Sequence, residues 1–520
     1  MLDALSSTLG FLTRDSALGS RPGVDAWLVP NATRDRLPRI QSCSVPCFAI
    51  LPAERSQPEA LKSPSVIFTE ATAVPAVLSG RRLVLEGPQD IHPIPSWLSP
   101  MMPLASVAHA TVWASRPDLS PRHFYTAFAI PELAAGECIF HHFNQRRFIA
   151  LLPLLAFLRA VTEEPGWVPP PLQACFMFDD PNLHWSTYGH IDFATLAEHA
   201  AKHRYHVASA TIPLDAWFVH EPTAALFREH ADRISLLMHG NDHVNEELAR
   251  ELEPTQRLGV LAQALDRIEK LERRSKVAVS RFMAPPHGAC SEPMLATMAE
   301  LGYEGACISR GSLEHFNQGA GWTRDIGIRP SDFVSGTPVF SRFRIGRDCQ
   351  IAIVIAALLR QPIIPVGHHQ DVAGGLRLFS ELAEFINSLG DVCWRSMSDI
   401  GKAHYATRLE GRILRARMHS RLVEITVPDG VRQLVIERPW LDSGSSEPLI
   451  IVPKTGSQPE TVSASVPLSV VPGQQVVVRS GPAPLNFVAA LPRRGLPVWP
   501  MARRLLTEAR DRVAPILNWV

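Results

Sequence analysis

Apolar and polar positions follow two different periods along the middle of the chain. Short apolar runs, each long enough for one buried strand, alternate there with stretches in which apolar residues recur every three or four positions. The apolar runs lie at 174–178, 205–213, 234–239, 279–286, 305–309, 362–369 and 392–398, and the helical stretches at 195–204, 224–232, 246–274, 293–302, 349–361 and 376–390. Repeated strand-then-helix units predict a parallel sheet with covering helices, either a barrel or a doubly wound sheet.

The regions on either side of this middle part, 169–405, have different patterns. Residues 1–168 mix short apolar runs with many prolines and end in the proline-rich break at 164–171, so we expect a mixed α/β domain there. Residues 406–497 contain alternating apolar and polar stretches separated by Pro, Gly, Asp and Ser, which predicts a small antiparallel β-sandwich. Residues 498–520 predict a terminal helix that docks by its apolar stripe.

The overall charge narrows the possible partners. The 520 residues include 51 basic and 51 acidic side chains, and this balance argues against a nucleic-acid partner, which normally requires a basic surplus. The first residues lack a basic start followed by an apolar core, so we expect a cytoplasmic protein. The apolar run at 148–161 is shorter than the roughly 20 residues of a spanning helix, and we therefore expect no transmembrane segment.

Polar residues follow four of the predicted strands directly. The carboxyl ends of parallel strands meet at one edge of a sheet, where the connecting loops form sites. The residues at these four ends are Asp179, Asp180, His239, His243, His287, His368 and His369. The sequence therefore predicts that carboxylates and imidazoles gather at one edge.

The aspartate pair and the histidine pair together favour a metal site. Two adjacent carboxylates at a strand end need a cation or a basic group to stay ionised, although an Asp-Pro turn or a helix cap is an alternative reading. His239 and His243 lie four positions apart, which brings two imidazoles to the same side, although core or surface histidines show this spacing too. Two imidazoles and one carboxylate form a three-ligand site with open positions for water and substrate, and this donor set suits zinc.

The same residues resemble two motifs of a known family. The stretches FMFDDPN and HGNDH are similar to the Thr-Phe-Asp-Asp and His-(Ser/Thr)-x-x-His motifs of polysaccharide deacetylases with a NodB-homology domain. The resemblance covers about residues 170–405 and implies a distorted (β/α) barrel. It also implies that Asp179 is the general base and that Asp180, His239 and His243 hold a divalent metal.

The third family motif, Arg-x-Pro-(Phe/Tyr)-Gly, is only partly matched by residues 284–288. Ala284 stands where the family has an arginine that pairs with the base aspartate, and Arg281 just upstream is a possible substitute. His287 stands where a backbone amide helps to bind the oxyanion, a role that does not depend on the side chain.

The last family motif, Leu-x-x-His, supplies the general acid and is similar to PIIPVGHH. The resemblance leaves two candidates, His368 and His369, of which we prefer His368 because it follows the strand directly. Asp371 and Asp399 are the candidates for the carboxylate that tunes this histidine.

Two residues after the first motif, His184 and Trp185, belong to an aromatic and polar loop. The loop either lines a sugar site, since rings stack on pyranose faces, or is an ordinary packed loop. The sequence as a whole predicts a metal-dependent hydrolase that removes acetyl groups from an N- or O-acetylated carbohydrate. The alternatives are a small-molecule hydrolase of non-peptide C–N bonds and, because of the missing arginine, a catalytically weakened carbohydrate-binding or polysaccharide-assembly protein.

Overall fold

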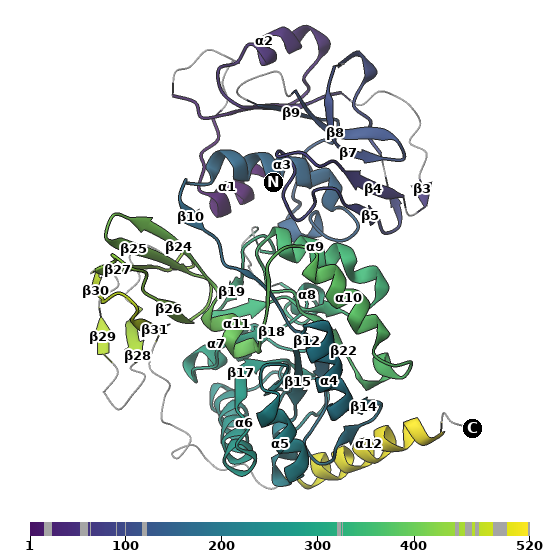
Figure 1. Cartoon of the computed structure of the whole chain (residues 1–520), viewed down its shortest axis with the longest axis vertical. Helices are drawn as coiled ribbons and strands as arrows, with labels where there is room; N and C mark the ends of the chain where they lie inside the picture. The colour runs from purple at the N-terminus through teal and green to yellow at the C-terminus, as the bar shows by residue number, and fades with distance from the viewer. Residues whose placement is uncertain are drawn as a thin grey trace. The chain divides into compact units, whose positions relative to one another are not determined.

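The chain folds into two compact units, which we describe separately (Figure 1). The first unit contains residues 1–165, 321–329 and 350–359, and the second contains residues 166–320, 330–349 and 360–520. The computed structural model describes residues 1–14, 23–52, 61–62, 64–89, 91–98, 100–116, 122–319, 324, 326–441, 447–452, 460–462, 467–481 and 497–517.

The first unit is built on a seven-stranded sheet with the order β1-β2-β9-β8-β7-β4-β5. Its strands are β1 (Trp27–Val29), β2 (Cys47–Ile50), β4 (Ser65–Phe68), β5 (Arg82–Val84), β7 (Met102–Val107), β8 (Ala110–Arg116) and β9 (His123–Thr126), with a separate pair β3 (Leu61–Lys62) and β6 (Pro88–Gln89). Its helices are α1 (Leu2–Leu9), α2 (Leu37–Gln41), α3 (Phe148–Thr162) and α9 (Gln350–Leu358). The apolar run at 148–161 thus forms α3, whose Phe157 ring lies 5.3 Å from Phe48 and 5.9 Å from Phe124 between centroids.

The second unit contains a nine-stranded sheet with the order β19-β20-β18-β17-β16-β15-β12-β22-β21. Its strands are β12 (Phe176–Asp179), β15 (Val207–Thr211), β16 (Ile234–Met238), β17 (Val279–Met283), β18 (Gly305–Cys307), β19 (Asp332–Val334), β20 (Thr337–Phe340), β21 (Phe343–Arg344) and β22 (Pro365–Gly367). Every pairing except β19–β20 is parallel. The predicted α/β fold with a parallel sheet is therefore confirmed, and the sheet curls into a half-barrel with β19 and β21 at its edges.

Helices lie between or after these strands along the chain (Figure 1). They are α4 (Phe193–His203), α5 (Glu221–Glu229), α6 (Pro254–Ser275), α7 (Glu292–Glu300), α8 (Arg310–His315), α10 (Arg377–Asn387) and α11 (Met397–Lys402). The unit also contains two short pairs of strands, β11 (Leu172–Ala174) with β23 (Val392–Trp394) and β13 (Thr187–Tyr188) with β14 (Ile191–Asp192).

The concave side of the half-barrel is filled by small and apolar side chains. α11 contributes Met397 and Ile400 to the same cluster. The strands and the residues directly next to them contribute Cys175, Met177, Ala208, Ala210, Leu237, Phe282, Ala284, Cys307, Phe340 and Ile364. Because this interior is packed and apolar, polar chemistry is confined to the ends of the strands.

One expected helix is shorter than its pattern predicts. The helical stretch at 246–274 begins as a helix only at Pro254, where proline's fixed φ and missing amide suit the first helical position. The side chain of Gln256 caps this end, since its Oε1 accepts the Glu253 amide at 3.0 Å. Residues 246–253 instead belong to the loop that leaves β16.

Two further sheets follow in the same unit and share one apolar core. One contains β10 (Trp167–Val168), β24 (Tyr405–Glu410), β25 (Ile413–Met418), β27 (Gln433–Glu437) and β30 (Leu468–Ser469), and the other β26 (Leu422–Thr426), β28 (Leu449–Val452), β29 (Glu460–Val462) and β31 (Gln475–Ser480). The last element is α12 (Val498–Leu517). Among the helices of the described ranges, none is both long and apolar enough to cross a bilayer.

Candidate metal centre and active site

The site lies at the carboxyl ends of neighbouring parallel strands. Asp179 is the last residue of β12, and Asp180 follows it with its amide donating to the Ala210 carbonyl of the adjacent strand end at 3.1 Å. His239 directly follows β16, and its amide donates to the Thr211 carbonyl at 2.9 Å. The sheet register therefore brings the aspartate pair and the first histidine together.

Asp180, His239 and His243 converge so that their ligand atoms lie within 4.8 Å of one another. Asp180 Oδ1 is 3.1 Å from His243 Nε2 and 3.6 Å from His239 Nε2, yet within the described chain this buried oxygen has no hydrogen-bond partner. A buried carboxylate oxygen surrounded by two imidazole nitrogens fits the donor set of a hydrolytic metal site.

The protonation of these groups also suits a metal. His239 Nδ1 donates to the Ala284 carbonyl at 2.7 Å, a tautomer that leaves the Nε2 lone pair available as a ligand. Burial would raise the pKa of Asp180, but the close imidazoles of His239 and His243 hold it well below its usual range. The carboxylate is therefore ionised, as a metal ligand must be.

The loop that presents His243 is organised by Glu247, a residue that the sequence assigned to a helix. The buried Glu247 carboxylate accepts the amides of Asn241, Asp242 and His243 at 2.6, 2.9 and 3.1 Å. Gly240 makes this approach possible, because with its φ of 65° a Cβ there would collide with Glu247 Oε1. A glutamate four positions after His243 was the available signal.

The partner of Asp179 is Arg342, which the sequence did not indicate. Arg342 Nη1 donates to Asp179 Oδ1 at 2.7 Å, and both side chains are buried. Arg281, the suggested substitute for the family arginine, instead pairs with Glu272 on α6 at 2.7 Å. Arg342 follows the end of β20 and is therefore, like the other site residues, a polar residue after a strand. It was missed in the sequence because no strand was predicted at Thr337–Phe340.

This pairing keeps Asp179 ionised. Burial would raise the pKa of the Asp179 carboxyl, but the charge of Arg342 and then that of His239 lower it. A hydrogen bond from Arg342 and the charge of His368 add to this lowering of the pKa. The imidazole of His368 is thus close enough to Asp179 to influence it electrostatically.

The two candidate acids occupy different environments. His368 follows β22, is exposed, and its amide donates to Asp371 Oδ2 at 2.8 Å. His369 is buried, with Nε2 3.8 Å from Asp511 Oδ1 on α12. Asp399 instead lies in α11. The amide of the preceding residue, Ser398, donates to the Ser280 hydroxyl near the start of β17, so Asp399 is at the amino ends of the strands, opposite the site.

The three residues that we expected to contact the substrate also lie in different surroundings. The His287 ring lies 5.5 Å from the His243 ring between centroids, and its backbone has a φ of 58° in the turn after β17. Trp185 is 57% exposed, and the guanidinium carbon of Arg512 lies 5.7 Å from its ring centroid. His184 is buried, with Nδ1 3.0 Å from Glu508 and Nε2 2.9 Å from the Asp215 carbonyl, so the packed-loop alternative fits it better.

The terminal helix α12 (yellow in Figure 1) docks by its polar side, which corrects the expected apolar docking. Its buried Arg504 pairs with Asp215 at 2.8 Å, and its buried Glu508 meets His184. Among the described side chains of the helix, five large apolar ones are exposed, namely Val498, Trp499, Leu505, Leu506 and Val513. The reason is that complementary charges after β12 and β15 compensate the buried charges of the helix.

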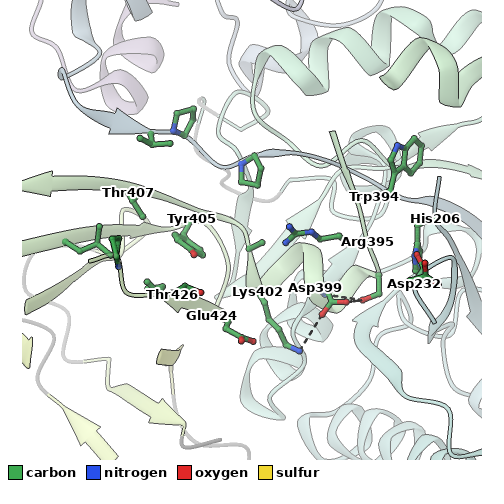
Figure 2. A pocket seen from close by; sticks show the side chains of 18 of the residues that line it. His206, Asp232, Trp394, Arg395, Asp399, Lys402, Tyr405, Thr407, Glu424 and Thr426 are labelled. Carbon is green, nitrogen blue, oxygen red and sulfur yellow. Dashed lines mark hydrogen bonds and ion pairs between the residues drawn. The ribbon is translucent and has the colours of Figure 1, made fainter. Parts of the chain in front are cut away.

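A separate groove of about 730 Å³ lies elsewhere in the second unit (Figure 2). His206 and Asp232, which line it, precede β15 and β16 and therefore mark the amino ends of the strands. Trp394, Lys402 and Glu424 line it as well. Asp399 also lines this groove, whereas Asp179, Asp180, His239, His243 and His368 do not.

The fold and the site together define an α/β protein with a candidate metal centre. No family model and no curated protein matches the chain. Solved structures that resemble it include a candidate polysaccharide deacetylase from Mycobacterium smegmatis, at 14% identity over 45% of this chain and 92% of that one, with a TM-score of 0.31.

Two other matches are of the same kind. A family 4 carbohydrate esterase from Streptomyces lividans is 12% identical over 44% of this chain and 93% of that one, with a TM-score of 0.27. A family 4 pseudoenzyme from Bacillus anthracis is 12% identical over 43% of this chain and 62% of that one, with a TM-score of 0.25. The matches fall in the family that the two motifs resemble, while the proposals below rest on the site's own side chains.

Proposed function

We propose that this chain is a metal-dependent hydrolase that removes acetyl groups from an N- or O-acetylated carbohydrate. The observation that carries the proposal is the convergence of Asp180, His239 and His243 beside the ionised Asp179–Arg342 pair. A three-ligand site next to a carboxylate base is the arrangement that metal-assisted hydrolysis requires.

The metal would be held by Asp180 Oδ1 and the Nε2 atoms of His239 and His243, and zinc suits two nitrogen donors with one carboxylate. When bound, such an ion supplies Lewis acidity to an acyl oxygen and lowers the pKa of water.

Two side chains move the protons. Asp179 takes a proton from the attacking water, and Arg342 keeps this carboxylate ionised between turnovers. His368 gives a proton to the leaving amine or alcohol as acetate departs, because it is exposed at the strand end and acts electrostatically on Asp179. The buried His369 supports the contact with α12 instead.

The remaining contacts orient the substrate. The His287 amide is suited to the acyl oxygen, since its turn follows β17 next to His243. The exposed Trp185 ring offers a face for a pyranose.

The alternatives differ in how well the site supports them. The catalytically weakened protein was suggested by the missing motif arginine, and Arg342 supplies a guanidinium to Asp179 from another strand. A hydrolase of C–N bonds in a small molecule would use the same groups and differs only in the substrate tested. The cytoplasmic location stays a prediction.

The test is acetate release from N-acetylglucosamine oligomers and an O-acetylated xylo-oligosaccharide, after chelation and again after zinc is restored. We expect release only with metal, and we expect His239→Ala and His243→Ala to lose both zinc and activity. His203→Ala is the matched control, because His199 and His203 are also four residues apart, with rings 4.3 Å apart, but lie on α4. Full zinc content in both site variants would contradict the assignment.

A further inference from the structure

Two consecutive arginines of α12 reach the backbone of two candidate metal ligands. Arg504 Nη2 donates to the Asp180 carbonyl at 2.9 Å, across 324 positions of sequence. Arg503 Nη1 donates to the His243 carbonyl at 2.9 Å, across 260 positions. The final helix of the chain therefore joins the loops after β12 and β16.

The two residues held in this way share an uncommon backbone conformation. Asp180 has a φ of 85° and His243 a φ of 53°, both in the left-handed region that non-glycine residues rarely adopt. Such conformations persist only where surrounding contacts fix them. At Asp180 and His243 the carbonyl oxygens are fixed by α12.

Arg504 is itself held rigidly. Its side chain is 5% exposed, pairs with Asp215 at 2.8 Å, and donates from Nη1 to the Tyr188 hydroxyl at 3.2 Å. Asp215 lies in the turn Pro213–Trp217 after β15. Arg504 thus connects the ends of β12 and β15, whereas the partly exposed Arg503 reaches the loop after β16.

We propose that α12 is a structural part of the metal centre, in which Arg503 and Arg504 act as positioning residues. They hold the Asp180 and His243 backbones in the conformation that directs both side chains to one ion. This inference rests on the proposed function only in that the site binds a metal. Contacts behind the ligands of metal sites typically contribute 10- to 100-fold in affinity.

The test compares Arg503→Met and Arg504→Met with the parent full-length chain. We expect zinc affinity, measured by competition with a chromophoric chelator, to fall about 10-fold or more. We also expect the cobalt-substituted variants to show an altered d–d absorption spectrum, which a general loss of stability would not produce. In the metal-free proteins, amides of the loops at Asp180 and His243 should exchange faster than in the parent.

Arg228→Met is the matched control, because Arg228 also donates to a backbone carbonyl, that of Ser275, and pairs with Glu221, away from the site. If Arg504→Met does not fold because Asp215 is left unpaired, Arg503→Met decides the outcome, since Arg503 makes one contact at the site. Parent-like affinity, spectrum and exchange in the folded variants would overturn the proposal. A parent protein that binds no metal would overturn the proposed function. Amide exchange of the Asp180 and His243 loops that stays unchanged in metal-free Arg503→Met and Arg504→Met would overturn the positioning role of α12 separately.

Discussion

Asp179 is buried, and a buried carboxylate acts as a base at neutral pH only if nearby positive charge keeps it ionised. Arg342 provides that charge at 2.7 Å from a strand that is distant in sequence. The guanidinium therefore makes the pairing with the base aspartate that was expected of an arginine in the third motif, although Ala284 occupies the motif position.

Replacing Arg342 with Gln should shift the pH dependence of hydrolysis. Without the guanidinium, the pKa of Asp179 rises, so the base becomes protonated at a higher pH and the acidic limb of kcat/KM moves upward. Zinc content should stay close to that of the parent, because Arg342 does not contact the three ligands.

Arg281→Gln is the control, since Arg281 pairs with Glu272 on α6. Its pH profile should match the parent's. An unchanged acidic limb in folded Arg342→Gln would contradict the role that we assign to Arg342.

Among single residues, the sequence identified those site residues that lie shortly after predicted strands. Asp180, His239 and His243 were found in this way, and the structure brings them together. Arg342 could not be found, because it acts on a group from a distant segment and hydrophobic periodicity does not report such partners. Glu247 was assigned to a helix, and only its position four residues after His243 marked it.

The position of α12 depends on buried charged pairs. Burial would raise the pKa of Glu508, but hydrogen bonds and charges from His184 and Arg512 lower it to about 2. Burial would lower the pKa of His184, but Glu508 and Asp215 raise it above its ordinary value of 6.5. The two shifts have opposite consequences as the pH changes.

Docking of α12 should therefore be most stable between about pH 4.5 and 6.5. The contribution of Glu508, whose folded pKa is lowered, is lost as the pH falls from 4.5 toward 2. The contribution of His184, whose folded pKa is raised, is complete below 6.5 and is lost as the pH rises through its folded value. Protection of the α12 amides from hydrogen exchange should therefore be highest and nearly constant between these two pH values and should fall on either side.

Glu508→Gln should remove the acidic limb of this dependence, whereas Leu505→Ser on the exposed side of the same helix should keep it. A parent helix whose exchange protection does not vary with pH beyond the intrinsic exchange rates would contradict this account.

The sequence predicted that a helix ends the chain but assigned its buried side wrongly. Apolar periodicity identifies the two sides of an amphipathic helix, and the apolar one is normally buried. Here Asp215 and His184 offer charged partners at the strand ends, so the polar side of α12 is buried instead. Those partners lie about 290 to 324 residues away in sequence, which a local pattern cannot reveal.

Across the whole molecule, a bound metal should stabilise one unit selectively. All three candidate ligands belong to the second unit, and the first unit contains none of them. A ligand that binds only the folded state at 100 times its Kd adds about 2.7 kcal/mol to the free energy of unfolding.

Adding zinc to chelated protein should therefore raise the unfolding temperature of peptides from the second unit. Hydrogen exchange followed peptide by peptide during heating measures both units in one sample, with residues 1–165 as the internal control. Equal shifts in both units, or no shift in either, would contradict a specific site in the second unit.

The most direct test of the proposed function measures zinc stoichiometry and acetate release on the same preparations of the parent, Asp180→Asn and Asp179→Asn. We expect Asp180→Asn to lose zinc, and Asp179→Asn to keep zinc while its turnover falls by about 10²- to 10⁴-fold, the usual contribution of a general base. If Asp179→Asn emptied the site while Asp180→Asn kept it full, the two roles would be reversed. If both variants kept full zinc and the parent's rate, the metal-dependent hydrolase would be contradicted.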